Sequence, residues 1–198
     1  MQPQIDKKYN SKLTVEEYIN LEQETNQKYE YYDGEVYAMA GGTSAHSRIT
    51  MNVSARIHLA LLDKECEVMN SDTKIFLEHK NNYVYPDAMI LCNAEESENV
   101  KGAFTNPVVI IEVLSKSTES YDRGGKFRLY TQIPSLRYYI LIEQDAAQID
   151  VYSRKNATSL WSLQFITGLE NNLELVISET ETLSIPLSRI YDRVVFEG

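Results

Sequence analysis

The chain is poor in cysteine and in basic residues, and each shortage narrows the functions that it can have. Cys66 and Cys92 are the only cysteines in 198 residues, and no cluster of histidines lies near them. The pair is a poor zinc signature and predicts two free thiols in a reduced, cytoplasmic compartment. Lys and Arg number 19 against 29 Asp and Glu, a formal net charge of −10, which argues against binding nucleic acid through charge alone.

Long apolar runs are also missing. No run approaches the roughly 20 residues that a membrane-spanning helix needs, and the polar segment 1–10 does not resemble a secretory signal. We therefore expect no membrane association, a flexible N-terminus over residues 1–12 and a single domain over residues 13–198. The apolar fraction of 43% and the aromatic fraction of 10% are those of a globular chain.

The first third of the chain predicts a helix, a hairpin and a second helix. Thr14 and Glu17 have the spacing of a capping box, so a helix is expected to begin there. Asp33-Gly34 lies between two aromatic-rich runs and predicts a β-hairpin turn. Apolar residues then recur at helical spacing from a cap at Ser44 to about Leu62.

The rest of the chain predicts strands that are interrupted by one helix. The nearly unbroken apolar run 108–114 is expected to be a central strand buried on both faces. A helix is expected over 121–132, where Pro134 ends it. The remaining strands are expected at 74–78, 83–91, 137–143, 148–154 and, as short pieces, within 161–196. This order predicts an α/β (α+β) fold with a mixed central β-sheet flanked by helices.

Two carboxylates on expected strands carry the first functional signal. Glu112 lies inside the apolar run, where a charge is unfavourable unless a basic partner or a metal cation balances it. Asp87 follows Pro86, whose missing N–H marks a strand edge or a bulge. Carboxylates on adjacent strands can converge on one divalent cation, and oxygen ligands favour Mg²⁺ or Mn²⁺ over Zn²⁺. A plain ion pair for Glu112 and a turn-ending role for Asp87 are the structural alternatives.

Lys126 is the third candidate. It lies in the helix that is expected after Glu112, and from there it can reach back over the strand that holds this carboxylate. A cation at that place would orient an attacking water or stabilise developing negative charge. A solvated surface lysine is the alternative, and surface positions are also the favoured interpretation of Arg123 and Arg128.

Taken together, these residues resemble the Uma-type family of restriction-endonuclease-like proteins, within the PD-(D/E)xK nuclease superfamily. The resemblance spans about residues 13–195, and its motifs in this chain are Glu30, Asp33-Gly34-Glu35, His46, Pro86-Asp87, Glu112-Val113-Leu114-Ser115, Ser117-Thr118, Asp122, Lys126, Tyr130 and Tyr138-Tyr139-Ile140-Leu141. The ensemble is specific, whereas no single motif is. It implies a restriction-endonuclease-like fold with an N-terminal helix and hairpin.

The resemblance also implies roles for individual residues. Asp87 and Glu112 would be the metal ligands, joined by the main-chain carbonyl of Val113. Lys126 would be the catalytic lysine, and Glu30 would match the first acidic residue of the motif. One departure from the superfamily is visible, because the lysine usually stands two residues after the glutamate, where this chain has a leucine. In the Uma-type pattern the following helix supplies the lysine instead.

His46 and Tyr130 are candidate accessory residues. His46 lies near the start of an expected helix, whose positive end would disfavour the imidazolium form. A neutral His46 can hydrogen-bond Glu30 or a scissile phosphate, and a purely structural hydrogen bond is an equal alternative. Tyr130 enters through the resemblance.

The resulting prediction is a Mg²⁺-dependent endonuclease that acts on DNA and uses no organic cofactor. We expect a homodimer, because the two strands of duplex DNA are related by a dyad. A nuclease-like module that binds nucleic acid or a protein partner without cutting is the main alternative, and the acidic charge and the displaced lysine favour it. Hydrolysis by a carboxylate pair, as in glycosidases, would account for two acids but not for Lys126.

Overall fold

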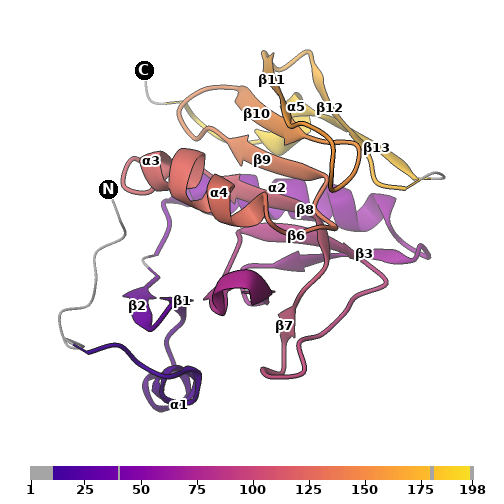
Figure 1. The fold of residues 1–198 in the computed structure, drawn as a ribbon. Helices are drawn as coiled ribbons and strands as arrows, with labels where there is room; N and C mark the ends of the chain where they lie inside the picture. Colours follow the sequence, from indigo (N-terminus) through magenta and orange to yellow (C-terminus); the bar gives the residue numbers. More distant parts are fainter. Residues whose placement is uncertain (1–10, 40, 179–180, 197–198) are drawn as a thin grey trace.

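A six-stranded sheet lies at the centre of the computed structural model, which describes residues 11–39, 41–178 and 181–196 (Figure 1). The strand order is β11-β10-β9-β8-β6-β3, in which β8 and β9 are parallel and the other neighbours antiparallel. The strands of this sheet are β3 (Cys66–Asn70), β6 (Ala88–Cys92), β8 (Pro107–Val113), β9 (Tyr138–Ile142), β10 (Gln148–Ser153) and β11 (Ser162–Thr167). The predicted mixed central sheet, with the apolar run 108–114 as an inner strand, is confirmed.

A five-stranded sheet packs beside the central one, in the order β2-β1-β5-β4-β7. Its strands are β1 (Tyr29–Tyr32), β2 (Glu35–Ala38), β4 (Lys74–Leu77), β5 (Asn82–Val84) and β7 (Ala103–Phe104). A two-stranded sheet follows near the C-terminus, formed by β12 (Asn172–Val176) and β13 (Thr182–Pro186). The prediction of one strand over 83–91 is wrong, because the chain leaves the five-stranded sheet after Val84 and enters the central sheet at Ala88. Pro86 lies at this crossing, where its missing N–H does not interrupt a ladder.

The helices confirm the predicted N-terminal helix and hairpin, with two differences in detail. The helical elements are α1 (Val15–Thr25), α2 (Ser44–Ala60), η1 (Glu78–Lys80), α3 (Glu119–Tyr121), η2 (Asp122–Lys126), α4 (Phe127–Tyr130) and α5 (Leu187–Ile190). The capping box of Thr14 and Glu17 is present in α1. The cap of α2 is Thr43 rather than the predicted Ser44, since the Thr43 hydroxyl accepts a hydrogen bond from the backbone N–H of His46, in the first turn of the helix. The single helix expected over 121–132 is broken by the π-turn η2.

The turn between β1 and β2 has the backbone conformation that the Asp33-Gly34 sequence predicted. Asp33 and Gly34 both have positive φ values, 46° and 95°, as a two-residue hairpin turn requires. Ahead of the hairpin, Lys12 contacts Asp33 through an ion pair of 2.6 Å. Residues 1–10 of the segment expected to be flexible lie outside the described residues.

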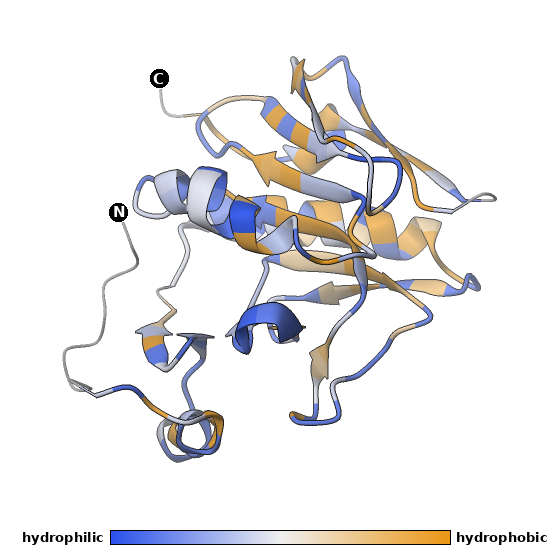
Figure 2. Cartoon of the chain, in the orientation of Figure 1, coloured by the Kyte–Doolittle hydropathy of each residue, from blue (hydrophilic) through white to orange (hydrophobic). Residues whose placement is uncertain are grey.

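Apolar side chains cover both faces of the central sheet. On one face, α2 contributes Ile49, Val53 and Ile57 to a core that also includes residues of α5, β12 and β13. On the other face, α4 and the five-stranded sheet pack against β6, β8 and β9. Figure 2 shows the hydrophobic residues gathered along α2 and the central strands. Because β8 is buried on both sides, any charged side chain on it must find its partners inside the protein.

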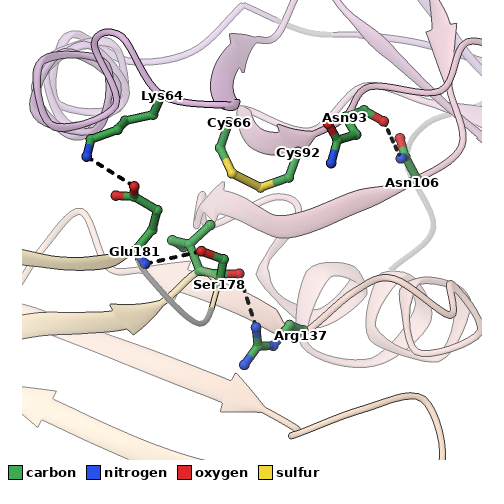
Figure 3. Close-up of a disulfide and its surroundings, with 9 residues drawn as sticks. Lys64, Cys66, Cys92, Asn93, Asn106, Arg137, Ser178 and Glu181 are labelled. Atoms are coloured by element: carbon green, nitrogen blue, oxygen red, sulfur yellow. Dashed lines mark hydrogen bonds and ion pairs between the residues drawn. A yellow bond between two sulfur atoms is a disulfide. The ribbon is translucent and has the colours of Figure 1, made fainter.

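Cys66 and Cys92 form a disulfide, so the prediction of two free thiols is wrong (Figure 3). The antiparallel register of β3 and β6 places the two cysteines directly opposite each other, with Cα atoms 4.1 Å apart. Their separation of 26 positions in the chain gave no sign of this pairing. The argument from free thiols to a reduced compartment therefore no longer applies. Within the described ranges, no helix is both long enough and apolar enough to cross a membrane.

Candidate active site

The strand register brings Asp87 and Glu112 side by side. Ala88 of β6 pairs with Ile111 of β8, and one further step along this antiparallel ladder places Asp87 opposite Glu112. The backbone N–H of Val113 donates to Asp87 Oδ2 at 2.7 Å, which fixes the aspartate against the end of β8. The two carboxylates that stood out in the sequence therefore lie on neighbouring chain segments of the same sheet.

Lys126 meets Glu112 inside the core. Its Nζ donates to Glu112 Oε1 at 3.0 Å, and the hydroxyl of Tyr130 donates to the same oxygen at 2.9 Å. Glu112 is 3% exposed and Lys126 8%. Lys126 is thus a buried partner of Glu112 and not the solvated surface lysine that was the alternative.

Two more carboxylates surround the Lys126 ammonium group. Glu30 Oε1 from β1 and Asp122 Oδ1 from η2 each lie 3.4 Å from Lys126 Nζ. The hydroxyl of Tyr32 donates to the other oxygen of Glu30 at 2.8 Å. Glu30 Oε1 and Asp122 Oδ1 are buried and have no hydrogen-bond partner among the residues that the structure describes. The structure therefore places Glu30 in the same cluster as Glu112 and Lys126.

Burial and charge shift the pKa values of this cluster. Burial raises the pKa of Glu112 well above its usual range, against the opposing effect of Lys126. Burial alone would lower the pKa of Lys126, but the charges of Glu112 and Glu30 outweigh it, so this pKa is raised. The Lys126 ammonium group therefore stays protonated. Its single positive charge does not neutralise all of the carboxylates around it.

His46 binds Asp87 and not Glu30, which corrects one of the two contacts expected for it. Its Nε2 lies 3.0 Å from Asp87 Oδ2. Burial lowers the pKa of His46, but the hydrogen bond and the charge of Asp87 raise it more, so the net shift is upward. The effect of the helix end on the imidazolium form stays a prediction, and the contact with Asp87 acts in the opposite direction.

A hydrogen-bonded chain ties the start of α2 to the end of β8. The hydroxyl of Thr43, the α2 cap, donates to the side-chain oxygen of Gln144, whose amide nitrogen donates to the carbonyl of Leu114. This chain runs parallel to the contact between His46 and Asp87. Neither Gln144 nor the role of Asp122 was found from the sequence. Asp122 had one local signal, its i,i+4 spacing to Lys126.

The two central carboxylates fit a hard divalent cation. Both hydrogen bonds of Asp87 end on Oδ2, and both of Glu112 end on Oε1. Asp87 Oδ1 and Glu112 Oε2 have no hydrogen-bond partner in the described part of the chain. In the same part of the chain, no group of three or more His, Cys, Asp or Glu side chains is arranged to hold a metal ion. Two carboxylates suffice for Mg²⁺, which keeps several waters and takes further oxygens from a phosphate.

Fold and site together define a restriction-endonuclease-like protein, and comparisons with known proteins agree. The chain belongs to the Uma2 family, described as "Putative restriction endonuclease", whose model matches residues 15–188. The resemblance found in the sequence is thereby confirmed.

Relatives and a solved structure extend this result. One uncharacterised protein of Synechocystis is 41% identical to this chain, over 76% of this chain and 78% of its own length. A second is 33% identical, over 82% of this chain and 92% of its own length. A crystal structure from Anabaena variabilis, described as a "putative nuclease belonging to DUF820", shares the fold with a TM-score of 0.71. It covers 92% of this chain and 99% of its own at 16% identity.

Proposed function

We propose that this protein is a divalent-metal-dependent endonuclease that hydrolyses phosphodiester bonds in DNA. One observation carries the proposal. Asp87 and Glu112 lie opposite each other, and Lys126 contacts Glu112 at 3.0 Å. Among the described residues, the hydrogen bonds of each carboxylate end on one oxygen and leave the other free. Two carboxylates beside a lysine supply the ligands for a cation and a positive charge for the phosphate. Membership of the Uma2 family supports the same reaction class.

In this proposal Asp87, Glu112 and the carbonyl of Val113 hold Mg²⁺ or Mn²⁺. The bound cation supplies Lewis-acid chemistry and lowers the pKa of water. Lys126 provides a fixed positive charge where negative charge develops on the phosphate. Glu30 keeps Lys126 protonated through its own charge. His46 and Tyr130 orient Asp87 and Glu112 through the hydrogen bonds described above.

Cleavage of both strands of a duplex requires two such sites related by a dyad. We therefore propose that the protein acts as a homodimer. Each protomer would direct its own Asp87 and Glu112 at one strand. Size-exclusion chromatography with light scattering measures this directly, and a monomer in the presence of cleavable duplex would contradict it.

Plasmid cleavage tests the site assignment. The protein is incubated with supercoiled plasmid, single-stranded DNA and a DNA junction, each with Mg²⁺ or Mn²⁺. Asp87→Asn keeps the shape of the side chain and removes its charge, so we expect loss of metal binding and a drop in cleavage of at least 100-fold, about 2.7 kcal/mol in the barrier. Asp72→Asn is the matched control, because Asp72 is exposed and bonds Lys28 away from the site.

A non-catalytic module on the same scaffold is the second candidate. The net charge of −10 and the burial of Lys126 among carboxylates favour it. If no DNA is cut and calorimetry detects no metal binding that depends on Asp87, the nuclease proposal fails. Partner binding that survives Asp87→Asn would then identify the module.

A further inference from the structure

An open depression of about 610 Å³ lies on the outer side of the helical segment that carries Lys126. Its basic side chains are His79 and Lys80, from the turn η1, and Arg128 from α4. Tyr121 and Gly125 belong to the same lining. We call this surface the basic groove. Figure 2 shows η1 and part of the α3–α4 segment as hydrophilic ribbon.

The basic side chains of the basic groove form no ion pair with any residue that the structure describes. No salt bridge joins His79, Lys80 or Arg128 to an acidic side chain in the described ranges, in a chain with 29 acidic residues. Glu78 shares the η1 turn but does not line the groove. Lys12, and to a smaller extent the charge of Lys80, lowers the pKa of Asp33. The Asp33 carboxylate is already bound by Lys12.

A second depression on the same helical segment provides a contrast. It is lined by Lys116 and Arg123, among others. Lys116 pairs with Asp145, and Arg123 contacts the carboxylates of Glu119, Glu143 and Asp150. Both cations there are already paired with carboxylates, whereas positive charge in the basic groove remains available to a ligand. The lowered pKa of His79, caused by partial burial and by Lys80, agrees with a positive local field.

The basic groove is connected to the candidate active site by direct packing. Gly125, which lines the groove, directly precedes the buried Lys126 in η2. The Tyr121 ring meets the Tyr32 ring edge-on at 6.0 Å between centroids. The Tyr32 hydroxyl in turn holds Glu30. A chain bound along the groove would thus lie one side-chain layer from the site.

We propose that the basic groove binds the sugar–phosphate backbone of the nucleic acid, with Lys80 and Arg128 each neutralising one phosphate. The proposal rests on the proposed nuclease function and names where its substrate is held. Phosphate contacts position a nucleic acid without reading its sequence. Arg128 offers a planar fork of donors that suits a phosphate, and Tyr121 offers an aromatic face at the same surface. A local groove of this kind explains how a chain of net charge −10 can hold a polyanion.

Salt dependence of DNA binding tests the proposal independently of cleavage. Binding of a fluorescent duplex is measured by anisotropy without divalent metal at several salt concentrations. Each neutralised phosphate contributes about 0.9 to the slope of log K against log salt. We expect the slope of the double variant K80Q/R128Q to be smaller by about 1.8. The matched control K101Q/K155Q removes two exposed lysines outside the groove and should keep the slope.

The outcomes separate this proposal from the nuclease proposal. A double variant that binds with the slope and affinity of the unmodified protein overturns the basic groove, even where cleavage is observed. Absence of any duplex binding by the unmodified protein also overturns it. A reduced slope in a protein that cuts no DNA keeps the groove and rejects the nuclease. Urea unfolding of both double variants controls for folding, because all four side chains are exposed.

Discussion

At the scale of the residue, the site is a buried cluster with more negative than positive charge. Lys126 is one cation among the carboxylates of Glu112, Glu30 and Asp122. Two of their oxygens are buried without a hydrogen bond, an arrangement that is unfavourable in a protein interior. Burial, together with the neighbouring negative charges, raises the pKa of Glu112 despite the opposing charge of Lys126. A divalent cation would supply the missing charge.

Removal of the lysine charge should therefore destabilise the fold. For Lys126→Met we expect a loss of about 3–5 kcal/mol in the free energy of unfolding at neutral pH, because three carboxylates lose their counter-charge. The pKa of Glu112 is already raised in the folded state, and it rises further in the variant. A raised carboxyl pKa favours folding at low pH and disfavours it as pH rises. The loss in the free energy of unfolding caused by Lys126→Met should therefore be smaller at acidic pH than at neutral pH.

Urea unfolding at several pH values measures this effect. Lys116→Met is the control, because Lys116 is exposed and pairs with Asp145 at 3.7 Å. Its free energy of unfolding should change by less than about 0.5 kcal/mol. Equal stability of the two variants would contradict the counter-charge role of Lys126.

Two of the site residues stood out in the sequence because each one carried a local anomaly. Glu112 interrupts an apolar strand, and Asp87 follows a proline. Lys126 became a candidate through its position in the helix expected after Glu112, and the family resemblance then implied its role. The contact of His46 with Asp87 could not be foreseen, because it depends on where the start of α2 lies against β6. Gln144 had no signal at all, since its two partners are distant in the chain.

At the scale of the element, the broken helix α3–η2–α4 sets the direction of the site residues. The π-turn η2 buries both Asp122 and Lys126 on its inner side. Short π-turns within helices are frequent at functional sites. Periodicity in the sequence predicted a continuous helix here, and an apolar run predicted a continuous strand over 83–91. Neither pattern shows a local change in winding or a crossing between sheets.

Two adjacent glycines in η2 offer a matched pair of variants. A Cβ on Gly125 would overlap the ring of Tyr121, whereas a Cβ on Gly124 meets nothing within 4 Å. We expect Gly125→Ala to lower the free energy of unfolding by about 1–3 kcal/mol, because the tyrosine must move. Gly124→Ala should be neutral or stabilising by up to about 1 kcal/mol, since alanine is less flexible in the unfolded chain. Thermal unfolding monitored by circular dichroism distinguishes the two, and equal losses would contradict this packing.

At the scale of the whole molecule, the disulfide joins β3, at the edge of the central sheet, to β6. β6 leads back to Asp87 at its other end. Closing a loop of this length restricts the unfolded chain and stabilises the protein by about 3 kcal/mol. We expect Cys66→Ser, or reduction of the protein, to lower the free energy of unfolding by that order.

Thiol titration in denaturant provides the chemical check. Protein purified without reductant should show no free thiol, and reduced protein should show two. Two free thiols in unreduced protein would contradict the cross-strand bond. If reduction leaves the free energy of unfolding unchanged, the estimate of about 3 kcal/mol is contradicted, whereas the disulfide itself is not.

The site takes residues from both large sheets, and this has a consequence for the order of events during synthesis. Glu30 comes from the five-stranded sheet, Glu112 from the central sheet, and Lys126 from the helix that follows it. No fragment that ends before residue 126 contains all three. A ribosome-bound chain therefore cannot assemble the cluster until both sheets and the broken helix have emerged and docked. If the protein cuts DNA, an incomplete nascent chain cannot do so, because the site forms only when the tertiary structure is complete.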